Sequence, residues 1–122
     1  MKRQFPPESR SASAARNFVL EAGWSDDPET NLRLATAVSE VVTNAILHAR
    51  TPFHVTVVPS TAAIRVAVTD ESPDPPVRRS YDAHHPTGRG LHIVDALVDR
   101  WGISSEQSGK TVWFELNRES VV

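Results

Sequence analysis

The chain has 122 residues, of which 39% are hydrophobic and 23% charged, and its formal net charge is −2. This size suits a single domain, so we expect residues 1–122 to share one core. The absence of cysteine excludes disulfides and thiol catalysis, and the small net charge argues against binding to nucleic acid or membranes. The sequence contains neither a secretory signal nor a long apolar run, so we expect a cytoplasmic protein.

The first half of the chain predicts an edge strand followed by two helices. Residues 1–8 suit a short edge strand or arm. The apolar residues within 9–21 have helical spacing, which predicts a first helix that ends at Gly23. Polar N-cap candidates directly precede Pro28, which predicts a long helix over residues 28–49. The core face of this long helix is predicted to consist of Leu34, Val38, Val41, Val42, Ala45 and Ala49.

The second half predicts a hairpin, a long loop, a helix and two closing strands. The loop contains too many prolines for a helix or a central strand, and loops of this length are usually functional or disordered. The expected fold is therefore α+β, a two-layer α/β sandwich with about three helices on one face of a mixed, largely antiparallel sheet. In order, the hairpin strands cover 54–58 and 64–68, the loop 71–87, the helix 88–100, and the closing strands 101–105 and 110–117.

A polar stripe interrupts the long helix beside its core face. Glu40, Asn44 and His48 are spaced four apart and therefore lie along one side of the helix. Alone, the stripe is explained equally well by a hydrated helix edge. Three further elements favour a site: Asp70 ends a strand, Gly88-Arg89-Gly90-Leu91 opens a helix, and Gly109-Lys110-Thr111 enters the last strand.

Two other motifs do not support a site. Ser108-Gly109-Lys110-Thr111 resembles the end of a P-loop, but Ser104 stands where a glycine is needed and a strand follows instead of a helix. The five histidines include the pair His84 and His85, but none has the ligand spacing of a helical zinc site. A nucleotide P-loop and a histidine metal centre are therefore not expected.

The remaining motifs resemble those of the gyrase, histidine-kinase and MutL type of ATPases, which have the Bergerat fold. The similarity is greatest to the small anti-sigma-factor serine kinases of the SpoIIAB and RsbW type. It extends over nearly all of the chain: Glu40–His48 matches the N-box, Asp70 the adenine-binding aspartate, Gly88–Leu91 the second glycine box and Thr111 the final threonine. The N-box is the most specific of these matches.

The resemblance implies a role for each residue in binding ATP and Mg²⁺. The amide oxygen of Asn44 is a hard ligand suited to Mg²⁺, and Glu40, one turn earlier, is the candidate general base. Asp70 would accept a hydrogen bond from the adenine amine, with support from Thr111. The remaining residues assigned to nucleotide binding are His48, Gly88, Arg89, Gly90 and Leu91, the two glycines because they let backbone N–H groups approach phosphate.

One motif departs from the family pattern. The first glycine box of the family reads D-x-G-x-G after the aspartate, whereas this chain has Asp70-Glu71-Ser72-Pro73-Asp74. Those glycines let the backbone fold over adenine, so the proline predicts a stiffer lid of different shape. We still expect the nucleotide site to be retained.

The function implied by the resemblance is that of an ATP-dependent serine/threonine protein kinase and anti-sigma factor. Its substrate would be a small anti-sigma-factor antagonist, a sigma factor is the second implied partner, and a homodimer is among the assemblies that the resemblance allows. The alternative is a non-catalytic, nucleotide-gated module that sequesters such a partner. A third function, the catalytic domain of a sensor histidine kinase, would need a dimerising helix with a phospho-accepting histidine upstream. Only about 27 residues precede the long helix, so this function is not expected.

Overall fold

The computed structural model describes residues 1–72, 86–106 and 108–118, with the backbone alone for residues 86–90. Three helices and five strands lie within these ranges. The helices are α1 (Arg10–Leu20), α2 (Pro28–His48) and α3 (Pro86–Leu97). The strands are β1 (Lys2–Phe5), β2 (Phe53–Pro59), β3 (Ala63–Asp70), β4 (Arg100–Glu106) and β5 (Gly109–Asn117).

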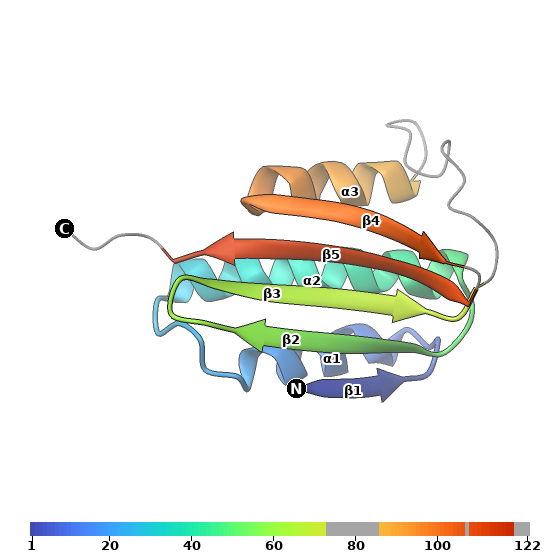
Figure 1. Cartoon of the computed structure of the whole chain (residues 1–122), viewed down its shortest axis with the longest axis horizontal. Helices are drawn as coiled ribbons and strands as arrows, with labels where there is room; N and C mark the ends of the chain where they lie inside the picture. The colour runs from blue at the N-terminus through green and yellow to red at the C-terminus, as the bar shows by residue number, and fades with distance from the viewer. Residues whose placement is uncertain (73–85, 107, 119–122) are drawn as a thin grey trace.

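The strands form one sheet in the order β1-β2-β3-β5-β4, and each neighbouring pair is antiparallel. Figure 1 shows the three helices on the same side of this sheet, behind the strands in that view. The predicted α+β sandwich is thereby confirmed, with the difference that every described strand pair is antiparallel and none is parallel. The central pair, β3 and β5, joins segments that are far apart in the sequence.

The long helix α2 begins where its sequence predicts. Asp27 is the N-cap, its carboxylate accepts the backbone N–H of Thr30 at 3.0 Å, and Pro28 is the first helical residue. Hydrogen bonds from Thr30 lower the pKa of Asp27, because they favour its charged form. The predicted core residues of α2 are buried except Ala49, which lies half-buried at the C-cap, just past the end of the helix.

The third helix is displaced from its predicted bounds at both ends. It begins at Pro86 and ends at Leu97, whereas residues 88–100 were predicted. Proline is favoured in the first turn of a helix because its missing N–H has no helical partner there. Arg100 belongs to β4, which starts pairing with β5 opposite Glu115. Most of the predicted loop, including His84 and His85, lies outside the described residues.

The core lies between the sheet and the helices. Alternate residues of the central strands face the helices and are buried, with Val55 and Val57 in β2 and Phe114 and Leu116 in β5 as examples. Arg33 links α2 to α3, because its guanidinium donates to the Leu97 carbonyl oxygen at 2.8 and 3.2 Å. This contact fixes the end of α3 against α2, the helix that carries Glu40, Asn44 and His48.

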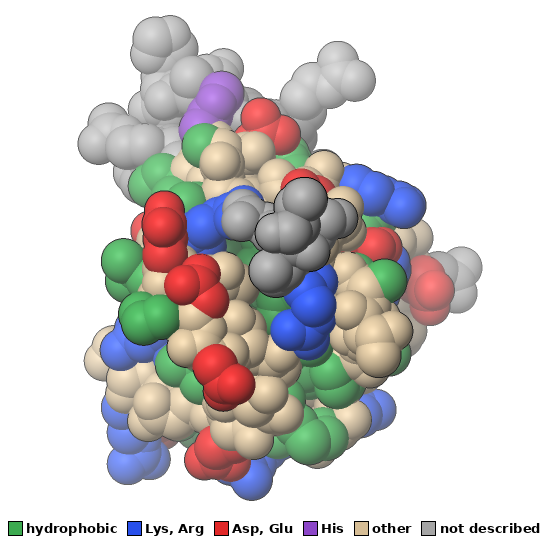
Figure 2. Space-filling model, turned by 90° about the vertical axis from the view of Figure 1, so that its left-hand side faces the viewer, with side chains coloured by type: hydrophobic (Ala, Val, Ile, Leu, Met, Phe, Trp, Pro, Cys, Tyr) green, Lys and Arg blue, Asp and Glu red, His purple; other side chains and the backbone are tan. Residues whose placement is uncertain are grey.

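The surface has no dominant charge in the view of Figure 2, which looks at the left-hand side of Figure 1. Acidic and basic side chains both occur there, among hydrophobic and uncharged ones. This mixture fits the formal net charge of −2. In the part of the chain that the structure describes, no helix combines the length and the apolar character needed to span a bilayer.

Candidate functional site

A small pocket lies where α2 crosses the ends of β3 and β5. Its volume is about 10 Å³, which is roughly the room that one water molecule needs. Polar side chains from all three elements reach it, and valine and alanine side chains form the rest of the wall. The lining residues are Val41, Asn44, Ala45, His48, Val68, Asp70, Lys110 and Val112.

The polar stripe of α2 forms one side of this region. Asn44 is buried and lines the pocket, and His48, at the exposed end of the helix, lines it as well. Glu40 lies one turn before Asn44 and is half-buried. Burial raises the pKa of the Glu40 carboxyl, because loss of water disfavours the charged form. A carboxyl with a raised proton affinity is suited to general base catalysis.

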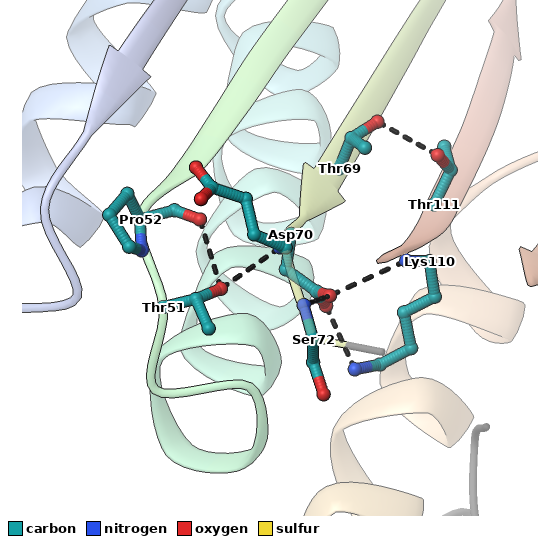
Figure 3. A network of polar contacts seen from close by, with 8 residues as sticks. Thr51, Pro52, Thr69, Asp70, Ser72, Lys110 and Thr111 are labelled. Atoms are coloured by element: carbon teal, nitrogen blue, oxygen red, sulfur yellow. Dashed lines mark hydrogen bonds and ion pairs between the residues drawn. The ribbon is translucent and has the colours of Figure 1, made fainter. Parts of the chain in front are cut away.

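Asp70 forms the opposite side of the pocket, at the last residue of β3, and is buried. One carboxylate oxygen, Oδ1, accepts the backbone N–H of Ser72 at 3.0 Å and that of Lys110 at 3.4 Å. The other, Oδ2, lies 2.8 Å from the Lys110 ammonium nitrogen. Figure 3 shows the Asp70 and Lys110 side chains directed toward each other. Both carboxylate oxygens are therefore engaged within the protein.

Thr111 does not occupy the position expected from the sequence. Its hydroxyl lies 2.8 Å from the Thr69 hydroxyl, directly opposite it in the β3–β5 pair (Figure 3). Because successive side chains of a strand point to opposite faces, Thr69 and Thr111 lie on the sheet face away from Asp70. The residue of β5 that contacts the Asp70 carboxylate is Lys110, one position earlier. Sequence reasoning missed this contact.

The signal that identifies Lys110 is the alternation within β5. Lys110 lies two residues before the buried Val112 and four before the buried Phe114. Its side chain therefore lies on the same face of the strand, which is the face toward the helices. A lysine at such a position requires a buried partner, since an unpaired buried charge is strongly unfavourable. Asp70, at the end of the neighbouring strand, is that partner.

The segment predicted as the second glycine box lies in the first turns of α3. The backbone of Gly88, Arg89 and Gly90 is helical, and their side-chain surroundings are outside the described part of the structure. Leu91 is buried in the hydrophobic core, so its side chain holds α3 against the rest of the domain. The structure thus gives Leu91 a packing role.

Gly109 brings the start of β5 close to the backbone of Asp70. Its φ is +152°, which L side chains rarely adopt, and an added Cβ would lie 2.0 Å from the Asp70 carbonyl oxygen. On the other side of Asp70, the backbone N–H of Glu71 donates to the Thr51 hydroxyl at 2.9 Å (Figure 3). These two contacts fix the backbone of Asp70, and with it the position of its carboxylate in the pocket.

Comparison with known proteins assigns the domain. The family model described as the histidine kinase-like ATPase domain matches residues 5–116. The chain belongs to this family. Membership of an ATPase domain family implies ATP as the ligand. Asn44 and His48 of the predicted N-box line the same pocket as Asp70.

Solved structures of other proteins share the fold at low sequence identity. The RsbU and RsbW domains of Rv1364c from Mycobacterium tuberculosis match 98% of this chain, with a TM-score of 0.69 and 19% identity. The chain spans about a third (34%) of that protein chain. The catalytic domain of the histidine kinase ThkA matches 96% of this chain and 95% of its own, with a TM-score of 0.62 and 16% identity.

A third match is the histidine kinase domain of the blue-light-activated kinase EL346 from Erythrobacter litoralis. It matches 92% of this chain and 61% of its own, with a TM-score of 0.57 and 22% identity. A search of curated protein sequences finds no significant match. At these identities, the structural matches establish the Bergerat-type fold and leave the substrate to be inferred from the site.

Proposed function

We propose that this domain is an ATP- and Mg²⁺-dependent serine/threonine protein kinase whose substrate is a small anti-sigma-factor antagonist. A sigma factor, held inactive by the same domain, is the second partner of the proposal. The family and the similarity to a protein with an RsbW domain support this function. The observation that carries it is the pairing of Glu40 and Asn44 one turn apart, beside a pocket that ends at Asp70.

Glu40 is proposed as the general base of the transfer step. The oxygen of the substrate hydroxyl forms a bond to the γ-phosphorus, while the bond from that phosphorus to the β–γ bridging oxygen breaks and ADP leaves. Glu40 takes the hydroxyl proton, and its raised pKa favours that transfer. A base in this position typically contributes about 10²–10⁴-fold to the rate.

Asn44 is proposed as the protein ligand of Mg²⁺. Its side-chain oxygen is the kind of hard donor that this ion prefers, and one or two protein ligands suffice when phosphates and waters complete the shell. When bound, Mg²⁺ neutralises charge on the phosphates of ATP. Asp70, which lines the same pocket as Asn44, is proposed to accept from the 6-amino group of adenine.

A second function, a nucleotide-gated binding module without kinase activity, is favoured by one specific observation. The pocket has a volume of only about 10 Å³, and the paired side chains of Lys110 and Asp70 form part of its wall. A purine ring needs far more room, so a nucleotide binds only after this region rearranges. The glycine-free sequence after Asp70 supports the same alternative.

Phosphate transfer separates the two functions. Purified protein is incubated with γ-labelled ATP, Mg²⁺ and candidate antagonist proteins, and the label on each partner is measured, with EDTA in place of Mg²⁺ as the control. The kinase proposal expects label on a serine or threonine of the antagonist, dependent on Mg²⁺. Nucleotide binding with no transfer to any partner would support the binding module instead.

A further inference from the structure

The Asp70–Lys110 ion pair lies inside the pocket at the point where the base of a nucleotide is proposed to be read. The two side chains are nearly inaccessible, with exposed fractions of 4% for Asp70 and 9% for Lys110, and Nζ lies 2.8 Å from Oδ2. Charge-assisted hydrogen bonds between buried groups are among the strong ones in proteins. Any ligand group that uses the Asp70 carboxylate must therefore compete with the Lys110 ammonium.

The limited space makes this competition direct. Lys110 and Asp70 both line a cavity of about 10 Å³, so a purine cannot enter unless the wall to which they belong rearranges. Lysine has a flexible four-carbon stem, and its ammonium can reach solvent by rotation of that stem. Entry of the base thus requires that Lys110 move away from Oδ2 or that it make a contact with the base itself.

The chemistry at position 6 of the purine decides which bases tolerate Lys110. Adenine has an amino group there, a donor that suits a carboxylate and is repelled by an ammonium. A 6-oxopurine has a carbonyl oxygen, an acceptor that suits the ammonium and is repelled by the carboxylate. We infer that Lys110 is a specificity-determining residue, which lowers the preference of the pocket for adenine over 6-oxopurines. This inference rests on the proposed nucleotide site and refines its selectivity.

The test compares ATP with inosine triphosphate, which replaces the 6-amino group by a carbonyl. Dissociation constants for both nucleotides are measured by calorimetry with the wild type and with Lys110→Thr. Threonine suits a strand and leaves room for a water beside Asp70. Lys2→Thr is the matched control, because Lys2 is exposed on β1, at the edge of the sheet away from β5. Lys110→Met, which keeps most of the buried stem, repeats the test in case the threonine variant does not fold.

The expected result is a gain in adenine selectivity. The ratio of the inosine triphosphate to the ATP dissociation constant should rise on the order of tenfold or more in the Lys110 variants and stay unchanged in Lys2→Thr. If the Lys110 variants bind ATP with an unchanged ratio of dissociation constants, or bind ATP more weakly than the wild type, the inference about Lys110 is overturned. The proposed function is not affected by either result. Absence of nucleotide binding in every variant and in the wild type would overturn the proposed function as well.

Discussion

Asn44 and Glu40 lie one helical turn apart on α2 but have different surroundings. Asn44 is buried and lines the pocket, whereas Glu40, one turn earlier on the helix, is half-buried and does not line it. This difference fits the two proposed roles, metal binding by Asn44 and proton transfer by Glu40. Each role can be removed by a single substitution that suits a helix.

Asn44→Ala should remove the contribution of Mg²⁺ to ATP binding. Alanine has the highest helix propensity and takes away the side-chain oxygen, so we expect ATP affinity in Mg²⁺ to fall by roughly tenfold or more. Calorimetry with Mg²⁺ and with EDTA measures the effect. Thr43→Ala, on the exposed side of the same helix, is the control. An Asn44→Ala variant with wild-type affinity in Mg²⁺ would show that another residue binds the ion.

The raised pKa of Glu40 also predicts how stability changes with pH. Burial raises the folded-state pKa above the unfolded value, so folding favours the protonated form and the wild type loses stability as pH rises through the folded pKa. Glu40→Gln has no such charge. We therefore expect the melting temperature of Glu40→Gln to exceed that of the wild type at pH 8, and the gap to close as pH falls below about 4.3, the ordinary pKa of glutamate. A constant gap over this range would contradict the argument.

At the scale of elements, the pocket depends on the junction between β3 and β5. Gly109 starts β5 directly against the backbone of Asp70, and Lys110 follows with both its N–H and its ammonium on the Asp70 carboxylate. The ends of two neighbouring strands are thus joined by one glycine and one ion pair. The position of Asp70 therefore depends on Gly109 and Lys110 as well as on β3.

Gly109→Ala should destabilise the fold strongly. The added Cβ would lie 2.0 Å from the Asp70 carbonyl oxygen, which forces the backbone of one strand to move, and we expect a loss of about 3 kcal/mol or more. Gly23→Ala is the control, because Gly23 has φ +64° but no atom within 4 Å of an added Cβ. That variant should lose only about 1–2 kcal/mol, from the left-handed backbone alone. If urea unfolding shows that Gly109→Ala and Gly23→Ala lose equal free energies of unfolding, the close approach of Gly109 to Asp70 does not contribute to the effect.

At the scale of the whole molecule, local sequence signals predicted the elements, and contacts between distant segments were harder to predict. The Asp27–Pro28 start of α2 depends on neighbouring residues, so its position follows from the sequence. The strand order and the contact between Lys110 and Asp70 depend on pairing across 40 residues. The role expected of Thr111 did not match the structure for the same reason, because a shift of one residue along a strand reverses the face.

The same contrast applies to function. The N-box stripe predicted a site because its three polar residues lie on one helix, and the predicted ATPase family is confirmed by the family match. The ion pair in the wall of the pocket could be recognised only from the pairing of β3 with β5. Similar folds at 16–22% identity therefore leave the selectivity and the catalytic competence of this pocket to experiment.

The central claim is that Glu40 is the base of a phosphoryl transfer, and single-turnover transfer by Glu40→Gln tests it most directly. Glutamine keeps the size and helix propensity of glutamate but cannot accept the proton, so ATP affinity should change little. Transfer of label from Mg²⁺-ATP to the antagonist should slow by on the order of 10²-fold, or roughly 3 kcal/mol of transition-state stabilisation. A Glu40→Gln variant that binds ATP and transfers phosphate at the wild-type rate would contradict the account.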